Sequence, residues 1–206
     1  MKILVLILLF LTTVVMAGWS EQEFNESQFH SGVKLGITMS NSLGDDAGGY
    51  EHDYKFGFEV GGLILYRINN LMTLQPEFLF TQKGQVLIIS RNPDIHVTVN
   101  YLQIPVLLSF KTAPGLKLYA GGYVSYLTNV WVSSSNLSDE DESNSEDEIE
   151  DATSNFDFGG IVGLMFRGDS NMLFDFRYER GFATLDETNK QDVFNHSFKL
   201  SVTWLF

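Results

Sequence analysis

The feature that most constrains this chain is a two-residue alternation of apolar and polar side chains that recurs over residues 31–206. The clearest example is the stretch 172–179, MLFDFRYE, in which every second residue is apolar. A helix would scatter its charged residues around the circumference, whereas a strand places them all on one face. The pattern therefore predicts β-strands with one apolar and one polar face.

Eight stretches share this alternation, and we expect each to form a strand of about 9 to 14 residues. Strands of this length exceed the mode of about 5 to 6 residues in globular proteins and match a tilted strand that crosses a bilayer. The eight stretches are 32–40, 56–67, 73–83, 101–111, 116–126, 156–167, 172–181 and 197–206.

The links between these stretches alternate in length. Tight links are expected at 68–71, 112–115 and 168–171, and long links at 41–53, 84–94, 129–154 and 182–195. Aromatic residues crowd the strand ends, as in the interfacial girdles of membrane barrels. One group is Tyr66, Phe110, Phe166, Trp204 and Phe206, and the other is Tyr54, Phe56, Phe80, Tyr126, Phe156 and Phe198.

Alternation alone fits two architectures: a soluble barrel or sandwich with its apolar face inward, and a membrane barrel with its apolar face toward lipid. Strand length, link length and the aromatic ends favour the second. We therefore predict an all-β fold, an eight-stranded antiparallel transmembrane up-and-down β-barrel over 31–206. Its short turns are expected to be periplasmic and its long loops extracellular, in the outer membrane of a Gram-negative bacterium.

The N-terminal segment has the features of a secretion signal. Lys2 precedes a short apolar run, and small residues surround Ala17, which predicts a signal peptide over 1–17. An uncleaved anchor is the alternative, but the run is short and lacks basic residues beyond it. Residues 18–30 are expected to form a short, polar, periplasmic N-terminal segment.

Composition excludes several classes of protein. The chain has no cysteine, so disulfides, thiolate metal sites and lipoprotein acylation are excluded. Its formal net charge is −13, and residues 139–151 hold nine of its 26 acidic side chains. No basic patch is present, which argues against nucleic acid as a partner.

Several motifs are similar to those of the PorT-like family of outer-membrane β-barrel proteins. They are Gly32-Val33-Lys34-Leu35-Gly36, Leu74-Gln75-Pro76-Glu77-Phe78, Tyr101-Leu102-Gln103-Ile104-Pro105, Phe174-Asp175-Phe176-Arg177-Tyr178 with Gly181, and the terminal Trp204-Leu205-Phe206. The resemblance implies a location in the outer membrane and no enzyme activity. It also implies recognition by the barrel-assembly machinery through the last strand, which ends at Phe206. The long acidic loop departs from the family pattern.

The charges on the polar faces are the first candidate site. In an eight-stranded barrel side chains fill the interior, so these charges must pair with one another. We expect a structural ion-pair network that plugs the lumen, with a narrow polar conduit as the alternative. Its members are Lys34, Glu59, Glu77, Asp157, Asp175, Arg177, Glu179 and Lys199.

The acidic run within 129–154 is the second candidate site. Five of its residues fall at EF-hand spacing and would supply the oxygen ligands of a weak calcium site: Asp139, Asp141, Ser143, Asp147 and Glu150. Asn144 stands where that motif needs glycine, and no helices flank the run. A solvated, mutually repelling charge run is the simpler interpretation.

Histidine supplies the third candidate. His52, His96 and His196 all fall toward the long links. A lipid-modifying barrel enzyme would need a histidine beside a hydroxyl nucleophile. However, His196 and Ser197 are neighbours on a strand and so point to opposite faces.

These observations predict a non-enzymatic outer-membrane barrel with a plugged lumen, acting as a surface-exposed binding or structural component. Its expected partners are outer-membrane lipid and an extracellular protein. The alternatives are a lipid-modifying outer-membrane enzyme and an accessory subunit of a protein-export system.

Overall fold

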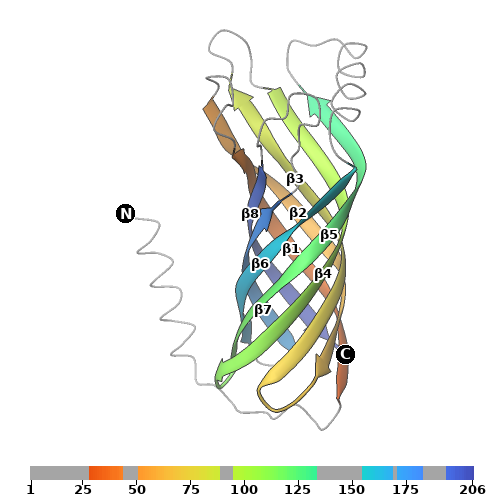
Figure 1. Ribbon diagram of the computed structural model, residues 1–206, viewed down its shortest axis with the longest axis vertical. Helices are drawn as coiled ribbons and strands as arrows, with labels where there is room; N and C mark the ends of the chain where they lie inside the picture. Colours follow the sequence, from red (N-terminus) through yellow and green to blue (C-terminus); the bar gives the residue numbers. More distant parts are fainter. Residues whose placement is uncertain (1–27, 44–50, 89–94, 134–154, 169–170, 183–193) are drawn as a thin grey trace, which may run out of the picture.

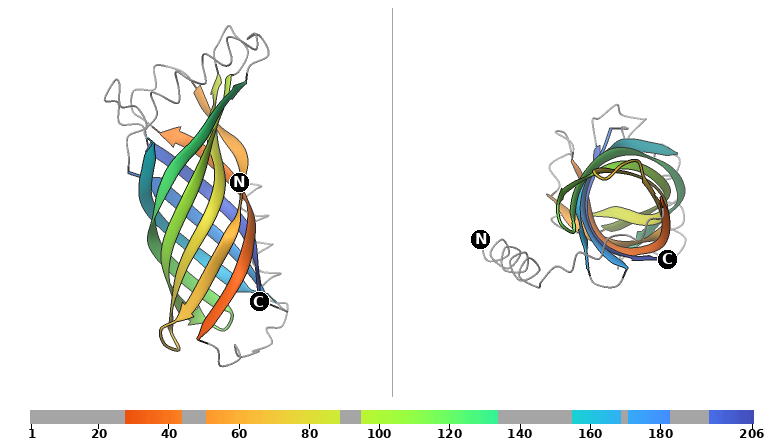
Figure 2. Two further views of the ribbon diagram at one scale, coloured as in Figure 1. Left: turned by 90° about the vertical axis from the view of Figure 1, so that its right-hand side faces the viewer. Right: turned by 90° about the horizontal axis from the view of Figure 1, so that it is seen from below.

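The structure is a computed structural model that describes residues 28–43, 51–88, 95–133, 155–168, 171–182 and 194–206. Eight antiparallel strands form one closed barrel in which each strand pairs with its sequence neighbours and β1 pairs with β8 (Figures 1 and 2). The predicted eight-stranded up-and-down barrel is therefore confirmed. The strands are β1 (Phe29–Leu43), β2 (Glu51–Arg67), β3 (Met72–Ile88), β4 (Ile95–Ala113), β5 (Leu116–Ser133), β6 (Phe156–Arg167), β7 (Met172–Gly181) and β8 (Phe194–Leu205).

The strands are steeply inclined to the barrel axis. A path of paired residues that leaves β1 at Phe29 passes once around the barrel and returns to β1 at Met39, ten residues further along. Such a stagger requires a strand tilt of about 35–45°. The path runs through Tyr66, Leu74, Leu108, Ala120, Val162, Tyr178 and Phe198.

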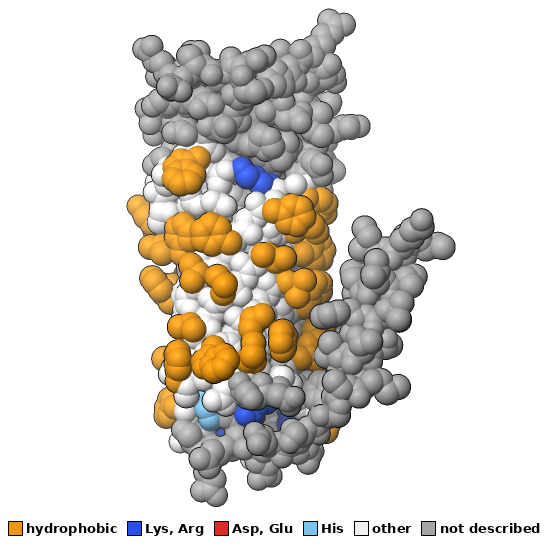
Figure 3. Space-filling view, turned by 180° about the vertical axis from the view of Figure 1, so that it is seen from behind, with side chains coloured by type: hydrophobic (Ala, Val, Ile, Leu, Met, Phe, Trp, Pro, Cys, Tyr) orange, Lys and Arg blue, Asp and Glu red, His pale blue; other side chains and the backbone are white. Residues whose placement is uncertain are grey.

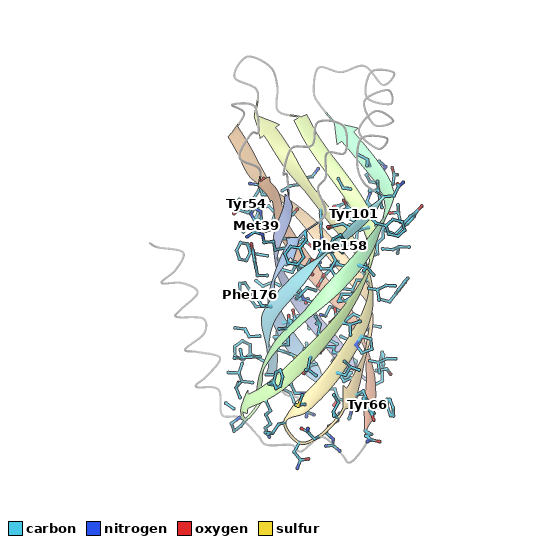
Figure 4. All side chains as sticks on the ribbon, viewed as in Figure 1. Met39, Tyr54, Tyr66, Tyr101, Phe158 and Phe176 are labelled. Carbon is cyan, nitrogen blue, oxygen red and sulfur yellow. The ribbon has the colours of Figure 1, made fainter. Side chains whose placement is uncertain are left out.

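The apolar faces of the strands point outward. Leu35, Phe56 and Val124 expose 64%, 70% and 56% of their surface, whereas the polar residues next to them in sequence point into the barrel. Figure 3 shows hydrophobic side chains spread over the wall, with Lys and Arg visible only at the upper and lower edges. In Figure 4, Tyr54 and Tyr66 lie toward opposite ends of the barrel. No helix among the described residues is long and apolar enough to span a bilayer.

Local sequence explains the three tight links. Gly115 and Asn171 both adopt positive φ angles, 69° and 60°, which glycine and asparagine tolerate best. In the link after β2, the Asn69 side-chain oxygen accepts hydrogen bonds from the backbone N–H groups of Leu71 and Met72, at 2.8 and 2.9 Å. We call this end of the barrel the short-turn rim and the opposite end the long-loop rim.

The strands are longer than expected at the long-loop rim. They run from 10 to 19 residues, and β3 and β5 continue to Ile88 and Ser133, through stretches expected to be loops. A bulge explains part of the difference. Asn100 pairs with Asn129 while Tyr101 pairs with Leu127, so β5 carries one extra residue there. An extra residue inverts the two faces of a strand and interrupts the alternation on which the prediction depended.

Gly163 on β6 lies under the ring of Tyr119, its partner on β5. A Cβ at Gly163 would stand 2.4 Å from the Tyr119 ring and 2.6 Å from the backbone oxygen of Phe176. The Tyr119 hydroxyl donates to both carboxylate oxygens of Asp175, at 2.9 Å each. The absence of a side chain at Gly163 therefore allows Tyr119 to extend over β6 and reach Asp175 on β7.

We predict that Gly163→Ala destabilises the barrel by about 1–3 kcal/mol, because the ring and the adjacent backbone must both shift. Urea unfolding in lipid vesicles would measure the change. Gly62→Ala is the matched control, since a Cβ there meets only one backbone oxygen, at 3.6 Å. Equal stability of the two variants would contradict the close approach of Tyr119 to Gly163.

Candidate functional site

The inward-facing side chains of β2, β4 and β6 are ordered along the barrel axis. Starting from the short-turn rim, three strands show the same order: a basic residue, then aliphatic residues, then members of a buried polar network. On β2 the order is Arg67, Leu65, Leu63 and Glu59; on β4 it is Lys111, Leu107 and Gln103; on β6 it is Arg167, Met165, Ile161 and Asp157. We refer to these as the basic rim, the apolar layer and the ionic network.

Arg177 organises the half of the ionic network nearer the apolar layer. Its two terminal nitrogens each donate to an oxygen of Glu77 at 3.0 Å, and its Nε donates to Asp175 at 3.2 Å. Lys34 adds a second cation, 2.8 Å from Glu77 and 3.6 Å from Asp175. All four side chains have no more than 3% of their surface exposed. A bidentate guanidinium–carboxylate pair is the strongest arrangement available to buried charges.

Glu179 connects this half of the ionic network to the half nearer the long-loop rim. It lies 3.7 Å from Arg177, 3.0 Å from Lys199 and 3.4 Å from Lys83. Lys199 also contacts Glu59 at 3.0 Å, and Lys83 lies 3.8 Å from Asp157. Every charged group in the chain of contacts therefore has at least one group of opposite sign within 4 Å.

Neutral polar and aromatic side chains complete the ionic network. The Tyr123 hydroxyl donates to Asp157 at 3.0 Å, and Gln103 donates to Glu179 at 3.1 Å while accepting from Lys199 at 3.1 Å. The ammonium group of Lys83 lies 4.6 Å from the centre of the Tyr123 ring, a distance at which a cation is attracted to the ring face.

The structure brings all eight predicted lumen charges together and buries each of them. It adds Lys83, which the sequence places on a polar face but which was not expected in the ionic network. The resulting five carboxylates and four cations carry a formal charge of −1. Because each charge has left water, removing one partner leaves its counterpart uncompensated. This geometry suits a structural plug.

The apolar layer was missed by the sequence analysis. Its members interrupt the alternation, since each aliphatic residue stands beside another apolar residue, as in Leu63-Ile64-Leu65 and Leu107-Leu108. Paired apolar residues inside an otherwise alternating strand are the signal that would have found it. The buried cluster comprises Leu63, Leu65, Leu107, Tyr119, Tyr123, Ile161, Met165, Leu173 and Leu205.

The other two predicted sites lie largely outside the described residues. Asp139, Asp141, Ser143, Asp147 and Glu150 fall in 134–154, and the side chains of His52 and His96 are also outside. Within the described residues, no group of three or more His, Asp or Glu side chains is arranged to hold a metal ion. The Nε2 atom of His196 lies 3.4 Å from the Tyr54 hydroxyl, and its ring packs edge-on against the Tyr54 ring.

Comparisons with known proteins agree with this architecture. A family model for an outer membrane protein beta-barrel domain matches residues 20–187. Ail, the attachment invasion locus protein of Yersinia pestis, is 20% identical with a TM-score of 0.52, covering 87% of this chain and 100% of its own. Neisserial surface protein A is 16% identical with a TM-score of 0.55, covering 87% of this chain and 98% of its own. No curated protein matches. At these identities the solved structures establish the fold.

We predict that Arg177→Ala destabilises the barrel by about 3–5 kcal/mol, because Glu77 and Asp175 would lose one of their two shared cations and would be left with Lys34 alone. Arg177→Lys should recover only part of the loss, since an ammonium group cannot bind a carboxylate in bidentate fashion. Unfolding in urea, followed by heat-modifiable electrophoretic mobility, would measure both. Arg180→Ala is the control, because Arg180 is exposed on the outer wall. An Arg177→Ala barrel as stable as this control would refute the proposed role of the network.

Proposed function

We propose that this chain, which belongs to the outer membrane protein beta-barrel domain family, is a non-enzymatic surface barrel whose long loops bind cations or a cationic partner. The chain is an outer-membrane protein, and its wall presents apolar side chains to lipid. The observation that carries the proposal is the filled lumen. With the interior occupied by the ionic network and the apolar layer, the loops are the part of the molecule left for interaction.

The plug supports a role other than transport. An eight-stranded barrel is just wide enough for side chains to fill it. Here the filling includes Arg177, Lys34, Lys199 and Glu59, each with at most 1% of its surface exposed. A solute would have to displace paired charges and then cross the apolar layer. Both steps carry a large free-energy cost, because the displaced charges would remain in a low-dielectric interior.

The charge of the loops supports a cationic ligand. The stretches between the strands at the long-loop rim, 44–50, 89–94, 134–154 and 182–193, contain 15 of the 26 acidic residues, against Arg91 and Lys190. Such an excess creates a negative potential that concentrates cations and steers positively charged partners. We assign the long-loop rim to the cell exterior, where these residues would face the medium.

The two alternative functions receive less support. Of the three candidate histidines at the long-loop rim, His196 is the one whose side chain the structure describes. Its ring packs against the rings of Tyr54 and Tyr178. Ser197 points to the other face, so this pair offers no nucleophile and base. The resemblance to the PorT-like family rests on short motifs within the strands. An accessory role in protein export depends on that resemblance, and no feature of the described structure supports it separately.

We predict that the barrel shows no sustained open levels in planar lipid bilayers at neutral pH. The buried charges and the apolar layer occupy the lumen between the described strands, so we expect them to block the passage of ions. The measurement is single-channel conductance on detergent-purified, folded protein. A known open porin reconstituted in the same bilayers serves as the positive control. Reproducible, long-lived open levels from this chain would contradict the plugged lumen.

Deleting residues 136–152 should abolish most calcium binding, measured by isothermal titration on the folded barrel. Two paired variants separate a specific site from a diffuse negative field. Asp139→Asn with Asp141→Asn removes two charges at EF-hand spacing, whereas Glu140→Gln with Glu142→Gln removes two neighbouring charges that do not fall at EF-hand positions. We expect equal losses, because a charge run attracts cations by its total charge. A loss confined to the first pair would indicate a specific calcium site, and unchanged binding after the deletion would refute a role for this loop.

A further inference from the structure

Arg180 on β7 stands out on the lipid-facing wall. Among the outward-facing positions whose side chains the structure describes, it is the one Lys, Arg, Asp or Glu residue. Its side chain is exposed, and it shares its face of β7 with Phe176 and Tyr178. No function described above uses a positive charge on this wall.

Arg180 lies at the long-loop end of the apolar wall. Its strand partner on β8 is His196, which pairs in turn with Asn41 on β1. In Figure 4, Tyr54 lies beyond Phe176 toward the long-loop rim. The next row of outward-facing partners, nearer the short-turn rim, has apolar and aromatic side chains: Tyr178, Phe198 and Met39. The wall therefore changes from apolar to polar at the row of Arg180, as expected where hydrocarbon gives way to lipid headgroups.

Aromatic rings lie on both sides of Arg180. On β8, the ring of His196 lies 6.5 Å from the ring of Tyr178. On β6, the partner of Arg180 is Gly160, and a Cβ there would stand 3.3 Å from the ring of Phe182. Rings of this kind gather at the level of the headgroups. An arginine among them can keep its stem in apolar surroundings while its guanidinium group reaches the headgroups.

His196 provides a second polar group beside Arg180. Its side chain is 6% exposed, and its Nδ1 atom is buried without a hydrogen-bond partner among the described residues. Its Nε2 atom lies 3.4 Å from the Tyr54 hydroxyl. When that hydroxyl donates to Nε2, the proton of the neutral ring is on Nδ1, which can then donate to an anion. Direct strand partners have Cβ atoms about 4.5–5.5 Å apart, so one anion can reach both residues.

The charge of Arg180 calls for an anion outside the barrel. An arginine on the lipid face of a barrel is tolerated near the interface and disfavoured toward the midplane. The carboxylates whose side chains the structure describes are buried on the other side of the wall, in the ionic network: Glu59, Glu77, Asp157, Asp175 and Glu179. A phosphate group outside the wall can accept two parallel hydrogen bonds from a guanidinium group.

We propose that Arg180 and His196 form a binding site for the phosphate of an anionic lipid in the outer leaflet. The acyl chains of that lipid lie along the apolar wall below, against Phe176 and Leu200, which expose 42% and 53% of their surface. The site is on the outer wall and takes an anion, so it stands or falls independently of cation binding by the long loops.

Native mass spectrometry of the folded barrel counts the lipids that it retains. The probe is an equimolar mixture of phosphatidic acid and phosphatidylcholine with the same acyl chains. We expect one phosphatidic acid to be retained about tenfold more often than phosphatidylcholine, and Arg180→Gln to abolish that preference. Arg180→Lys should keep part of it, since an ammonium group cannot bind two phosphate oxygens in bidentate fashion. Equal retention by Arg180→Gln and the unmodified barrel would overturn the proposal.

Two further variants separate a built site from a charge placed anywhere on the wall. Arg180→Gln with Val124→Arg moves the arginine to another exposed position of the wall, on β5, and should not restore the preference. Asp186→Asn with Glu187→Gln neutralises two acids that follow β7 in sequence and should leave the preference unchanged. Full recovery in the first variant would reduce the site to a general attraction, and a rise in the second would assign Arg180 to a carboxylate of the chain. Either result would refute the site.

Two controls complete the test. Excess inorganic phosphate should not displace the bound phosphatidic acid, because the acyl chains also contact the wall. Displacement would mean that the site takes free phosphate, which contradicts a lipid ligand. In phosphatidylcholine alone, the Arg180 variants should keep heat-modifiable mobility and unfold like the unmodified barrel, because the proposed ligand is absent.

Discussion

The structure depends on one constraint: charges placed inside a narrow barrel must neutralise one another. Arg177 can occupy the lumen only because Glu77, Asp175 and Glu179 surround it within 4 Å. In that low-dielectric interior an unpaired charge would cost several kcal/mol. The ionic network also crosses the lumen, since Lys34 on β1 contacts Glu77 on β3 and Asp175 on β7. The contacts that neutralise charge therefore also hold opposite walls together.

Closure of the barrel and filling of its interior reinforce each other. A stagger of ten residues over eight strands fixes how far the walls stand apart, and that distance matches pairs of long side chains such as Lys199 and Glu59. Where the contacts must be closer, residues without side chains make room. Gly163 accommodates Tyr119, whose hydroxyl then reaches Asp175. The small residues of the inner face therefore determine which contacts form, as the charged residues do.

The fold could be predicted from the sequence because alternate residues of a membrane strand belong to its lipid-facing and its lumen-facing side. The stretch from Met172 to Gly181 is both the clearest pattern and strand β7 itself. The prediction failed where the two-residue alternation is interrupted. The bulge opposite Asn100 concealed the end of β5, and adjacent apolar residues such as Leu63 and Ile64 concealed the apolar layer. The ion pairs could not be predicted either. Which cation contacts which carboxylate depends on the register and stagger of all eight strands, and no single strand contains that information.

Charge is divided along the barrel axis in a way that neither composition nor any one strand reveals. The net charge of −13 conceals strongly acidic stretches between the strands, a nearly neutral ionic network and basic residues beside the short turns. On β2 and β6, two buried aliphatic residues stand between the basic residue and the ionic network. This order along the axis appears only when the strands are placed in register, because each strand contributes a different residue to each level of the lumen.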